Sequence, residues 1–445
     1  MSLAGPCAGR RRAGTYRSGP GPHRGAAPSA VHFCLVRPLR SLFLSVGAAL
    51  GTFFPFLVVI LQERGLDAAA IGAVTAASSV AFGIAVPFWG HLGDVTLGRI
   101  RALQIGAIAS AVVVILFGLP FPALVAAGLV VSFSVFESSF SPLTDALALA
   151  NARDRDRDYP RIRMLMSLAF AVVSVACGVL YERAGYGAVS ILFTLCAVWI
   201  VLSVARVPDA PRARLVPPAG SAGTRGRRLG SVGAAFAIQP RLPLVLLAIG
   251  LVHVGILSGF TFLPLRLVAL GGGPEVVALS AGLAALAEVP AMFFAGAVAA
   301  RIGLRGLFAV ACILYAVMLA SWMVVDSPLV IIATRIPTGF AFAGVAIGSA
   351  LTLGALLPVE FQATGQALLQ TVAFGIAAVI ANLGGGIVYA NAGPGPLFAI
   401  GALAAVAAGV VGWLVFPTRG PTAAPADAGP GTAVIAPELE MPFGV

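Results

Sequence analysis

The feature that most constrains this chain is a series of apolar stretches, each long enough to cross a bilayer as a helix. A transmembrane helix needs about 20 mostly apolar residues. Such stretches recur along the 445 residues at 41–61, 69–90, 102–119, 123–147, 163–181, 187–205, 243–268, 276–299, 306–325, 329–353, 363–389 and 396–416. Only 10% of the residues are charged and the mean hydropathy is +1.00. That composition excludes a soluble enzyme, a disordered scaffold and a fibrous repeat. We therefore expect an all-α membrane protein with twelve transmembrane helices.

The twelve stretches fall into two groups of six, separated by a longer polar segment. The expected divisions are a basic tail at 1–40, a six-helix bundle at 41–205, a linker at 206–241, a second six-helix bundle at 242–416 and a tail at 417–445. Both tails have the polar, Gly- and Pro-containing composition of disordered segments. In the first tail, Arg10 to Arg12 are followed by polar residues, so it lacks the apolar core of a signal peptide.

Charge is distributed unevenly between the predicted loops. The net charge of +11 comes entirely from arginine. Most arginines lie in the tails, the linker and the even-numbered loops, whereas the odd-numbered loops contain Arg64, Arg183 and Arg266. The positive-inside rule then predicts a multi-pass protein of the cytoplasmic (inner) membrane with both termini in the cytoplasm. A nucleic-acid partner is excluded because the arginines lie between apolar segments instead of forming one basic face with aromatic residues.

A related loop motif occurs in each half of the chain. The loop after the second stretch reads Gly-His-Leu-Gly-Asp-Val-Thr-Leu-Gly-Arg, and its counterpart begins 206 residues later. The candidate gate residues in the two copies are Gly90, Asp94, Gly98 and Arg99, and Gly296, Arg301 and Gly303. Both copies resemble the loop pattern of the major facilitator superfamily, although Val95 replaces its Arg, Gly98 comes one residue late and Ala300 replaces its Asp. The resemblance implies the major facilitator fold of two six-helix bundles. It also implies that Asp94 closes a cytoplasmic gate by capping the start of the eleventh helix, where the helix dipole is positive.

Further patches resemble the phenylpropionate-permease and lactose-permease-like group of proton symporters. They run from Pro142 to Ala148, from Asp158 to Met164 and from Ser167 to Phe170. This resemblance implies that Asp145 and Arg163 face each other and bind substrate, and that Phe170 stacks on a sugar or an aromatic acid. An ionised group in the apolar zone costs at least ~2.5–3.5 kcal/mol without a partner, which favours such a pair on physical grounds. The alternatives are a solvated pair at the membrane surface and a Phe170 that serves core packing.

Four other ionisable residues lie within the predicted spans. Glu288 and Glu137 are candidate proton sites, because desolvation favours the neutral form of a carboxylic acid and makes proton uptake feasible near neutral pH. Arg335 stays charged and is a candidate for binding an anionic group or serving as a counter-charge. His253 is a third candidate for proton coupling, with an interhelical hydrogen bond as the alternative role. For Glu137 the alternative is a protonated acid that serves helix packing.

These observations together predict a secondary active transporter. We expect a monomer that moves a small polar or aromatic solute, together with protons, by rocking one bundle against the other. A proton-driven exporter is the main alternative, disfavoured because the fifth stretch lacks a Gly- and Pro-rich segment. A non-transporting membrane sensor is a remote alternative. An enzyme is not expected, because no paired His, Ser-His-acid set or phosphate-binding loop occurs. No metal or other cofactor is expected, because the cysteines are scattered without ligand spacing.

Overall fold

A computed structural model describes residues 30–151, 155–208, 232–358 and 361–418 of the chain. Throughout these residues the regular structure is helical, and eleven helical segments are long and apolar enough to cross a bilayer. One of them, α11 (Pro274–Val324), has 51 residues and contains a non-helical backbone conformation at Gly303. This break divides α11 into two lengths that correspond to the eighth and ninth expected spans. The described residues therefore confirm the all-α membrane fold with two groups of six spans.

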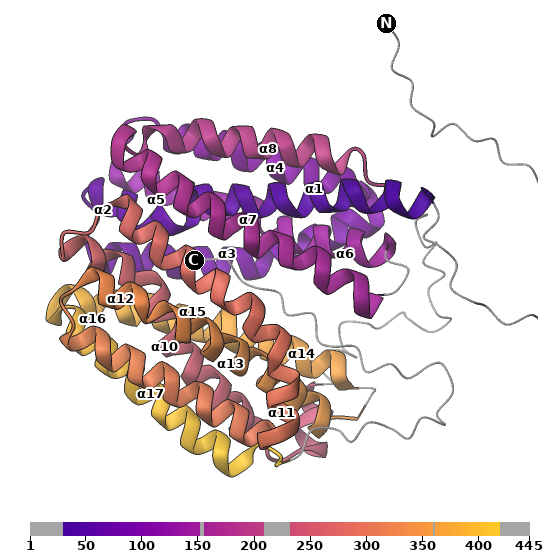
Figure 1. Ribbon diagram of the computed structural model, residues 1–445, viewed down its shortest axis with the longest axis vertical. Coiled ribbons are helices and arrows are strands. Elements are labelled where there is room, and N and C mark those ends of the chain that lie inside the picture. Colours follow the sequence, from indigo (N-terminus) through magenta and orange to yellow (C-terminus); the bar gives the residue numbers. More distant parts are fainter. Residues whose placement is uncertain (1–29, 152–154, 209–231, 359–360, 419–445) are drawn as a thin grey trace, which may run out of the picture.

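The N-terminal half of the molecule is built from residues before 208 and forms the upper, indigo-to-magenta part of Figure 1. Its helices are α1 (Ala30–Phe53), η1 (Phe54–Phe56), α2 (Leu57–Glu63), α3 (Ala68–His91), η2 (Leu92–Thr96), α4 (Arg99–Phe117), α5 (Ala123–Glu137), α6 (Phe140–Asn151), α7 (Arg155–Ala184), η3 (Tyr186–Ala188) and α8 (Val189–Val204). Several expected spans are thus interrupted. The first breaks at a 3-10 turn containing Pro55, and the fourth breaks between Glu137 and Phe140.

The C-terminal half lies beside it and forms the lower, orange-to-yellow part of Figure 1. After α10 (Leu242–Ala269) and α11 it contains α12 (Pro328–Ala333), α13 (Arg335–Leu356), α14 (Gln362–Gln370), η5 (Thr371–Ile376), α15 (Ala377–Val379), η6 (Ile380–Gly384), α16 (Gly385–Ala392) and α17 (Pro394–Val415). The tenth span breaks at Thr334, between α12 and α13. The eleventh span, α14 to α16, contains two π-helical segments, η5 and η6.

Glycines with positive φ reveal that the two halves repeat one backbone plan. Glycine adopts this conformation readily because it has no Cβ. Six described glycines do so, and they form three pairs separated by 206, 205 and 208 residues: Gly65 with Gly271, Gly98 with Gly303, and Gly185 with Gly393. Each pair lies at the same kind of junction between successive spans. The repeat suggested by the loop motif therefore extends over both halves.

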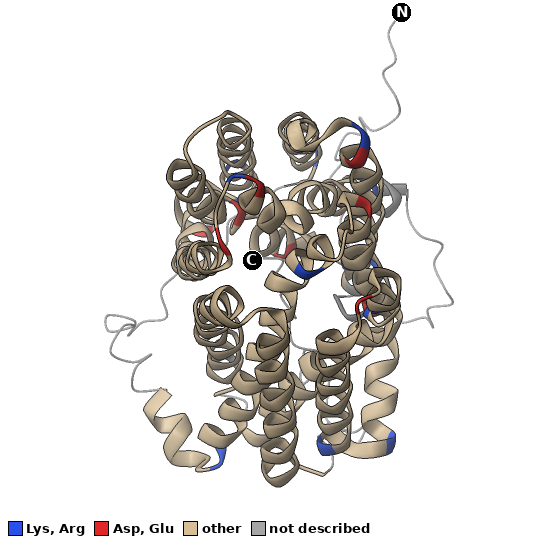
Figure 2. Cartoon of the chain, turned by 90° about the vertical axis from the view of Figure 1, so that its left-hand side faces the viewer, with Lys and Arg blue, Asp and Glu red and all other residues tan. Residues whose placement is uncertain are grey.

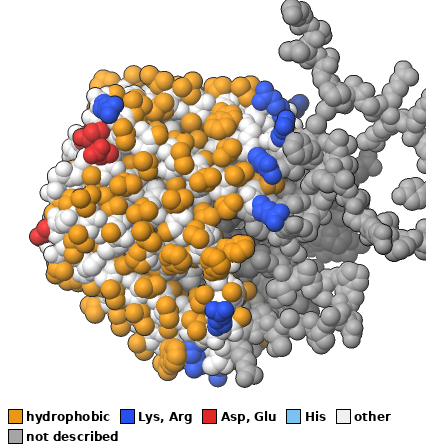
Figure 3. Space-filling model, viewed as in Figure 1, with side chains coloured by type: hydrophobic (Ala, Val, Ile, Leu, Met, Phe, Trp, Pro, Cys, Tyr) orange, Lys and Arg blue, Asp and Glu red, His pale blue; other side chains and the backbone are white. Residues whose placement is uncertain are grey.

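Charged side chains gather at the two ends of the helices. Figure 2 marks the charged residues on the ribbon, most of which is tan, and Figure 3 shows apolar side chains covering the surface between a basic and an acidic end. We name the first the arginine-rich face, which includes Arg99, Arg101, Arg241, Arg301 and Arg305. We name the second the acidic face, which includes Asp67, Glu182, Glu275 and Asp326. This distribution suits a protein whose middle lies in hydrocarbon.

The two halves contact each other closely near the acidic face. Gly72 of α3 lies against Gly386 of α16, where a Cβ on Gly72 would approach the Gly386 Cα to 2.8 Å. Gly178 of α7 lies equally close to Ala278 of α11, to which an added Cβ would approach within 2.4 Å. The repeat relates the two contacts, because Gly72 corresponds to Ala278 and Gly178 to Gly386. Small residues here let helices from different halves touch backbone to backbone.

Some expected boundaries differ from the observed ones or lie outside the described residues. α1 begins at Ala30, before the expected end of the basic tail at residue 40. The remainder of the 1–40 tail, most of the 206–241 linker and nearly all of the 417–445 tail fall outside the described residues. The expected disorder of these segments therefore stays a prediction.

Candidate functional site

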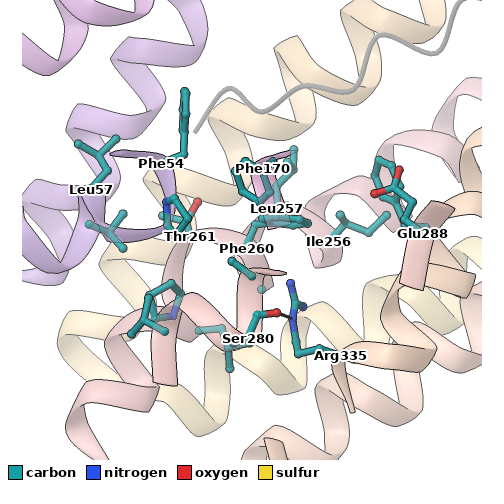
Figure 4. Close-up of a pocket in the computed structure, with 18 of the residues that line it drawn as sticks. Phe54, Leu57, Phe170, Ile256, Leu257, Phe260, Thr261, Ser280, Glu288 and Arg335 are labelled. Atoms are coloured by element: carbon teal, nitrogen blue, oxygen red, sulfur yellow. Dashed lines mark hydrogen bonds between the residues drawn. The ribbon is translucent and has the colours of Figure 1, made fainter. Parts of the chain in front are cut away.

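A cavity lies between the two halves and is lined by helices from both. It encloses about 980 Å³ of empty space, including the space at its open side. The N-terminal half contributes η1, α2 and α7, and the C-terminal half contributes α10, α11, α13 and η5. Most of the lining is apolar, with phenylalanines at 54, 170, 260, 342 and 374. Figure 4 shows the few polar side chains among them.

The break in the first span shapes one wall of this cavity. Pro55 has no backbone N–H, so the helix cannot continue through it without losing a hydrogen bond. The chain forms the 3-10 turn η1 instead, and Phe54 and Pro55 line the cavity at this turn. Interrupted spans near the middle of a bundle are typical of solute sites in membrane transporters.

Arg335 places a permanent positive charge on the wall of the cavity. Only 3% of its surface is exposed. Its Nε donates a hydrogen bond to the Ser280 backbone oxygen at 3.3 Å, and its guanidinium lies 5.4 Å from the ring centre of Phe260 and 5.6 Å from that of Trp322. These contacts orient the guanidinium (Figure 4) without a carboxylate partner among the described residues.

Glu288 is the acidic group on the same cavity wall. It is 7% exposed, and its Oε1 has no hydrogen-bond partner within the described part of the chain. No ion pair between described residues joins it to Arg335. Gly339 of α13 packs directly on the backbone at Glu288, which brings α11 and α13 together at this level. A buried, unpartnered carboxyl group is stable when protonated and can bind a solute group or release its proton.

Asp145 and Arg163 form a buried ion pair in the N-terminal half. The Arg163 guanidinium donates a hydrogen bond to the Asp145 carboxylate, and it also lies 3.4 Å from the Tyr159 hydroxyl. The Arg163 side chain is 14% exposed and the Asp145 side chain 7%, so the structure brings them together away from solvent. Neither residue is among those that line the cavity, and the role of the pair in substrate binding stays a prediction.

The three other predicted membrane residues occupy different positions. Phe170 lines the cavity, in agreement with a contact to solute. His253 lies behind Phe374, where its Nδ1 is 2.7 Å from the Ile249 backbone oxygen of its own helix. Glu137 is buried at the end of α5, with an Oε2 that lacks a partner among described groups. Neither His253 nor Glu137 lines the cavity.

The predicted gate loops lie at the arginine-rich face. Asp94 forms a 2.8 Å ion pair with Arg99 of the same loop. The π-helical segment η2 contains Asp94 and accommodates the residue that delays Gly98 in the motif. Gly98 and Gly303 take the same positive-φ conformation, whereas Gly90 and Gly296 lie within helices next to open space. Arg301 is exposed. A gating role for this set stays a prediction.

Several cavity residues are not identifiable from the sequence alone. Phe260, Thr261 and Ser280 line the cavity, and Trp322 supports Arg335 from behind. Thr261 and Ser280 are polar residues within apolar spans, which was the available signal. Their orientation toward the cavity depends on helix rotation, and the weak amphipathicity of such buried helices does not indicate it.

Comparisons with known proteins agree with this architecture. The chain matches the model of the MFS_1-like family over residues 38–400. It is 28% identical over 342 residues to a maltose permease of Geobacillus stearothermophilus, which covers 76% of this chain and 84% of the permease. Among solved structures, a mutant of the nucleoside transporter NupG matches with a TM-score of 0.75 and 15% identity, covering 86% of this chain and 100% of that chain. A D-xylose-proton symporter matches with a TM-score of 0.66 and 16% identity, covering 87% and 98%. At these identities the solved structures establish the fold alone.

Proposed function

We propose that this chain, which belongs to the MFS_1-like family of membrane transporters, takes up a small polar or aromatic solute together with protons. The observation that carries the proposal is the cavity between the two halves, where Arg335 and Glu288 face enclosed space without pairing with each other. A permanent cation can orient the solute, while a carboxyl group can change its protonation as the solute enters and leaves. The maltose permease and the D-xylose-proton symporter support the choice of a small solute and of symport.

The arrangement of the halves supports alternating access as the transport mechanism. Their close glycine contacts shut the acidic face, so the cavity opens there only when α3 separates from α16 and α7 from α11. The arginine-rich face supports a location in the inner membrane with that face toward the cytoplasm. One chain contains both halves of the cavity, so we propose a monomer as the transporting unit.

Uptake by proteoliposomes with an imposed pH gradient tests this function. The panel contains maltose, D-xylose, uridine, adenosine, 3-phenylpropionate and benzoate. We expect at least one compound to accumulate when the outside is more acidic, and a protonophore to abolish the accumulation. The Glu288→Gln variant should lose gradient-driven accumulation but keep exchange of labelled for unlabelled solute, because its side chain cannot release a proton. Glu275→Gln, at the exposed acidic face, is the control. Gradient-driven accumulation by Glu288→Gln would refute the proton site.

A further inference from the structure

Three buried polar side chains from three helices form one hydrogen-bonded chain beside the cavity. Thr261 of α10 donates from Oγ1 to Asn382 Oδ1 of η6 at 2.6 Å. Asn382 donates from Nδ2 to Ser79 Oγ of α3 over a longer 3.4 Å, and Ser79 donates to the Thr75 backbone oxygen at 2.9 Å. The exposed fractions of Thr261, Asn382 and Ser79 are 2%, 0% and 6%. Solvent therefore does not compete for these bonds.

The backbone oxygen at the far end of this chain determines its direction. A carbonyl oxygen can only accept, so the hydroxyl hydrogen of Ser79 is committed to Thr75. The Ser79 oxygen is then free to accept a hydrogen bond, and the amide nitrogen of Asn382 donates one to it. The amide oxygen of Asn382 consequently faces Thr261 and accepts a hydrogen bond from its hydroxyl group. Thr261 retains only oxygen lone pairs for any other partner.

The two ends of the chain belong to different parts of the transport machinery. Thr261 lines the cavity and is visible in Figure 4. Ser79 belongs to the N-terminal half, whereas Thr261 and Asn382 belong to the C-terminal half. Asn382 lies in the π-helical segment η6, whose extra residue per turn changes the direction of side chains relative to an α-helix. The bond between Asn382 and Ser79 therefore crosses the interface that must open.

We propose that Asn382 is a positioning residue that holds Thr261 as a hydrogen-bond acceptor on the cavity wall, so that the transported solute carries an O–H or N–H donor at that point. The inference rests on the proposed transport function and narrows its solute class to donor-bearing molecules such as sugars and nucleosides. Arg335, which can only donate, complements Thr261 across the lining. Separation of α3 from η6 removes Ser79 from the chain and releases the amide, so the acceptor is best ordered while the acidic face is closed.

Binding measurements on purified protein in detergent test this inference with two groups of probes. Maltose, D-xylose, uridine and adenosine carry donors, whereas ionised 3-phenylpropionate and benzoate carry acceptors only. We expect the wild type to bind at least one donor-bearing probe. Thr261→Val should weaken its binding about tenfold, since one neutral hydrogen bond is lost. Thr261→Ser should restore binding because it keeps the hydroxyl group.

Variants of the other two residues separate positioning from a purely structural role. Asn382→Ala should weaken binding of the donor-bearing probe as much as Thr261→Val does. Ser79→Ala should weaken it by an amount between that of Asn382→Ala and none. A structural defect would instead weaken the binding of both groups of probes equally, and that result would contradict the inference. Asn391→Ala is the control, because Asn391 is exposed and bonds to Ile387 of its own helix.

The outcomes distinguish this inference from the proposed function. Donor-bearing probes that bind Thr261→Val and Asn382→Ala as tightly as the wild type would overturn the inference alone. Exclusive binding of the acceptor-only carboxylates by the wild type would also overturn it while leaving transport intact. Failure of all six probes to bind or to be transported would refute the proposed solute class and this inference with it.

Discussion

At the scale of single residues, two buried arginines differ in whether a carboxylate neutralises their charge. Arg335 is oriented by a backbone oxygen and two aromatic rings, none of which neutralises it. Its charge therefore remains available to a solute. Arg163 is neutralised by Asp145 within its own half. Because the pair is buried away from solvent, each charge is stable only while its partner is present.

Removing one member of the Asp145–Arg163 pair should destabilise the protein strongly. Asp145→Asn or Arg163→Gln leaves an uncompensated charge in a poorly solvated site, a change that costs about 3–5 kcal/mol. The double variant removes both charges and should recover a large part of that loss. Thermal unfolding in detergent measures these differences. If the pair were solvated at the membrane surface, each single variant would unfold like the wild type, and Arg101→Gln at the exposed arginine-rich face provides that reference.

Which residues could be predicted depended on how rare their type is in a membrane span. Glu288 and Arg335 stood out because an ionisable residue among apolar ones is costly and needs a reason. The polarity of Thr261 was only a weak signal and Phe260 gave none, because threonine and phenylalanine are common in spans. Only helix rotation shows that they face the cavity. Asn382 is bonded to Ser79, which lies 303 residues away in the sequence, so no local pattern indicates this contact.

At the scale of helices, hydropathy predicted the spans but not the interruptions within them. The stretches expected at 41–61, 123–147 and 329–353 each contain a break, at η1, after Glu137 and at Thr334. Hydropathy measures transfer into hydrocarbon and is insensitive to a local change of backbone geometry. By contrast, the short polar loop around Gly303 predicted two separate helices, and the non-helical backbone at Gly303 divides α11 at that point.

Gly303 should be indispensable to that junction. Its φ of 75° and ψ of 168° lie in a region that only glycine adopts readily, and an added Cβ would meet the Thr418 backbone oxygen at 2.0 Å. Gly303→Ala should therefore lower the free energy of unfolding by at least about 1–3 kcal/mol. Gly296→Ala is the matched control, because Gly296 is helical and faces open space. Denaturation of both variants in detergent measures the difference, and equal stability would contradict the role given to the Gly303 backbone.

At the scale of the whole molecule, the repeat explains why one face can close by two equivalent contacts. Gly72 with Gly386, and Gly178 with Ala278, join the halves at positions related by the internal repeat. Each contact depends on the absence of side-chain atoms between two helices. In the proposed alternating access each half moves as one packed bundle, so opening the acidic face breaks both contacts together. Enlarging one contact should therefore shift the conformational equilibrium without altering the cavity.

Gly386→Leu should hold the acidic face open. A Cβ at Gly386 would already approach the Ala68 backbone oxygen to 2.6 Å, and the rest of a leucine side chain cannot fit between α3 and α16. Cells expressing the protein with a cavity cysteine, Ser280→Cys, report this state through a membrane-impermeant maleimide added outside. We expect several-fold faster labelling with Gly386→Leu than without it.

A second leucine variant distinguishes gate opening from a general loosening of the bundle. Gly83 lies on the same helix, α3, but is exposed and has no atom within 4 Å of an added Cβ. Gly83→Leu should therefore leave the labelling rate at position 280 unchanged. Equal rates for Gly386→Leu and Gly83→Leu would show that the α3–α16 contact does not control access. Faster labelling in Gly386→Leu alone would mean that a glycine without a functional group sets which side of the membrane the solute cavity faces.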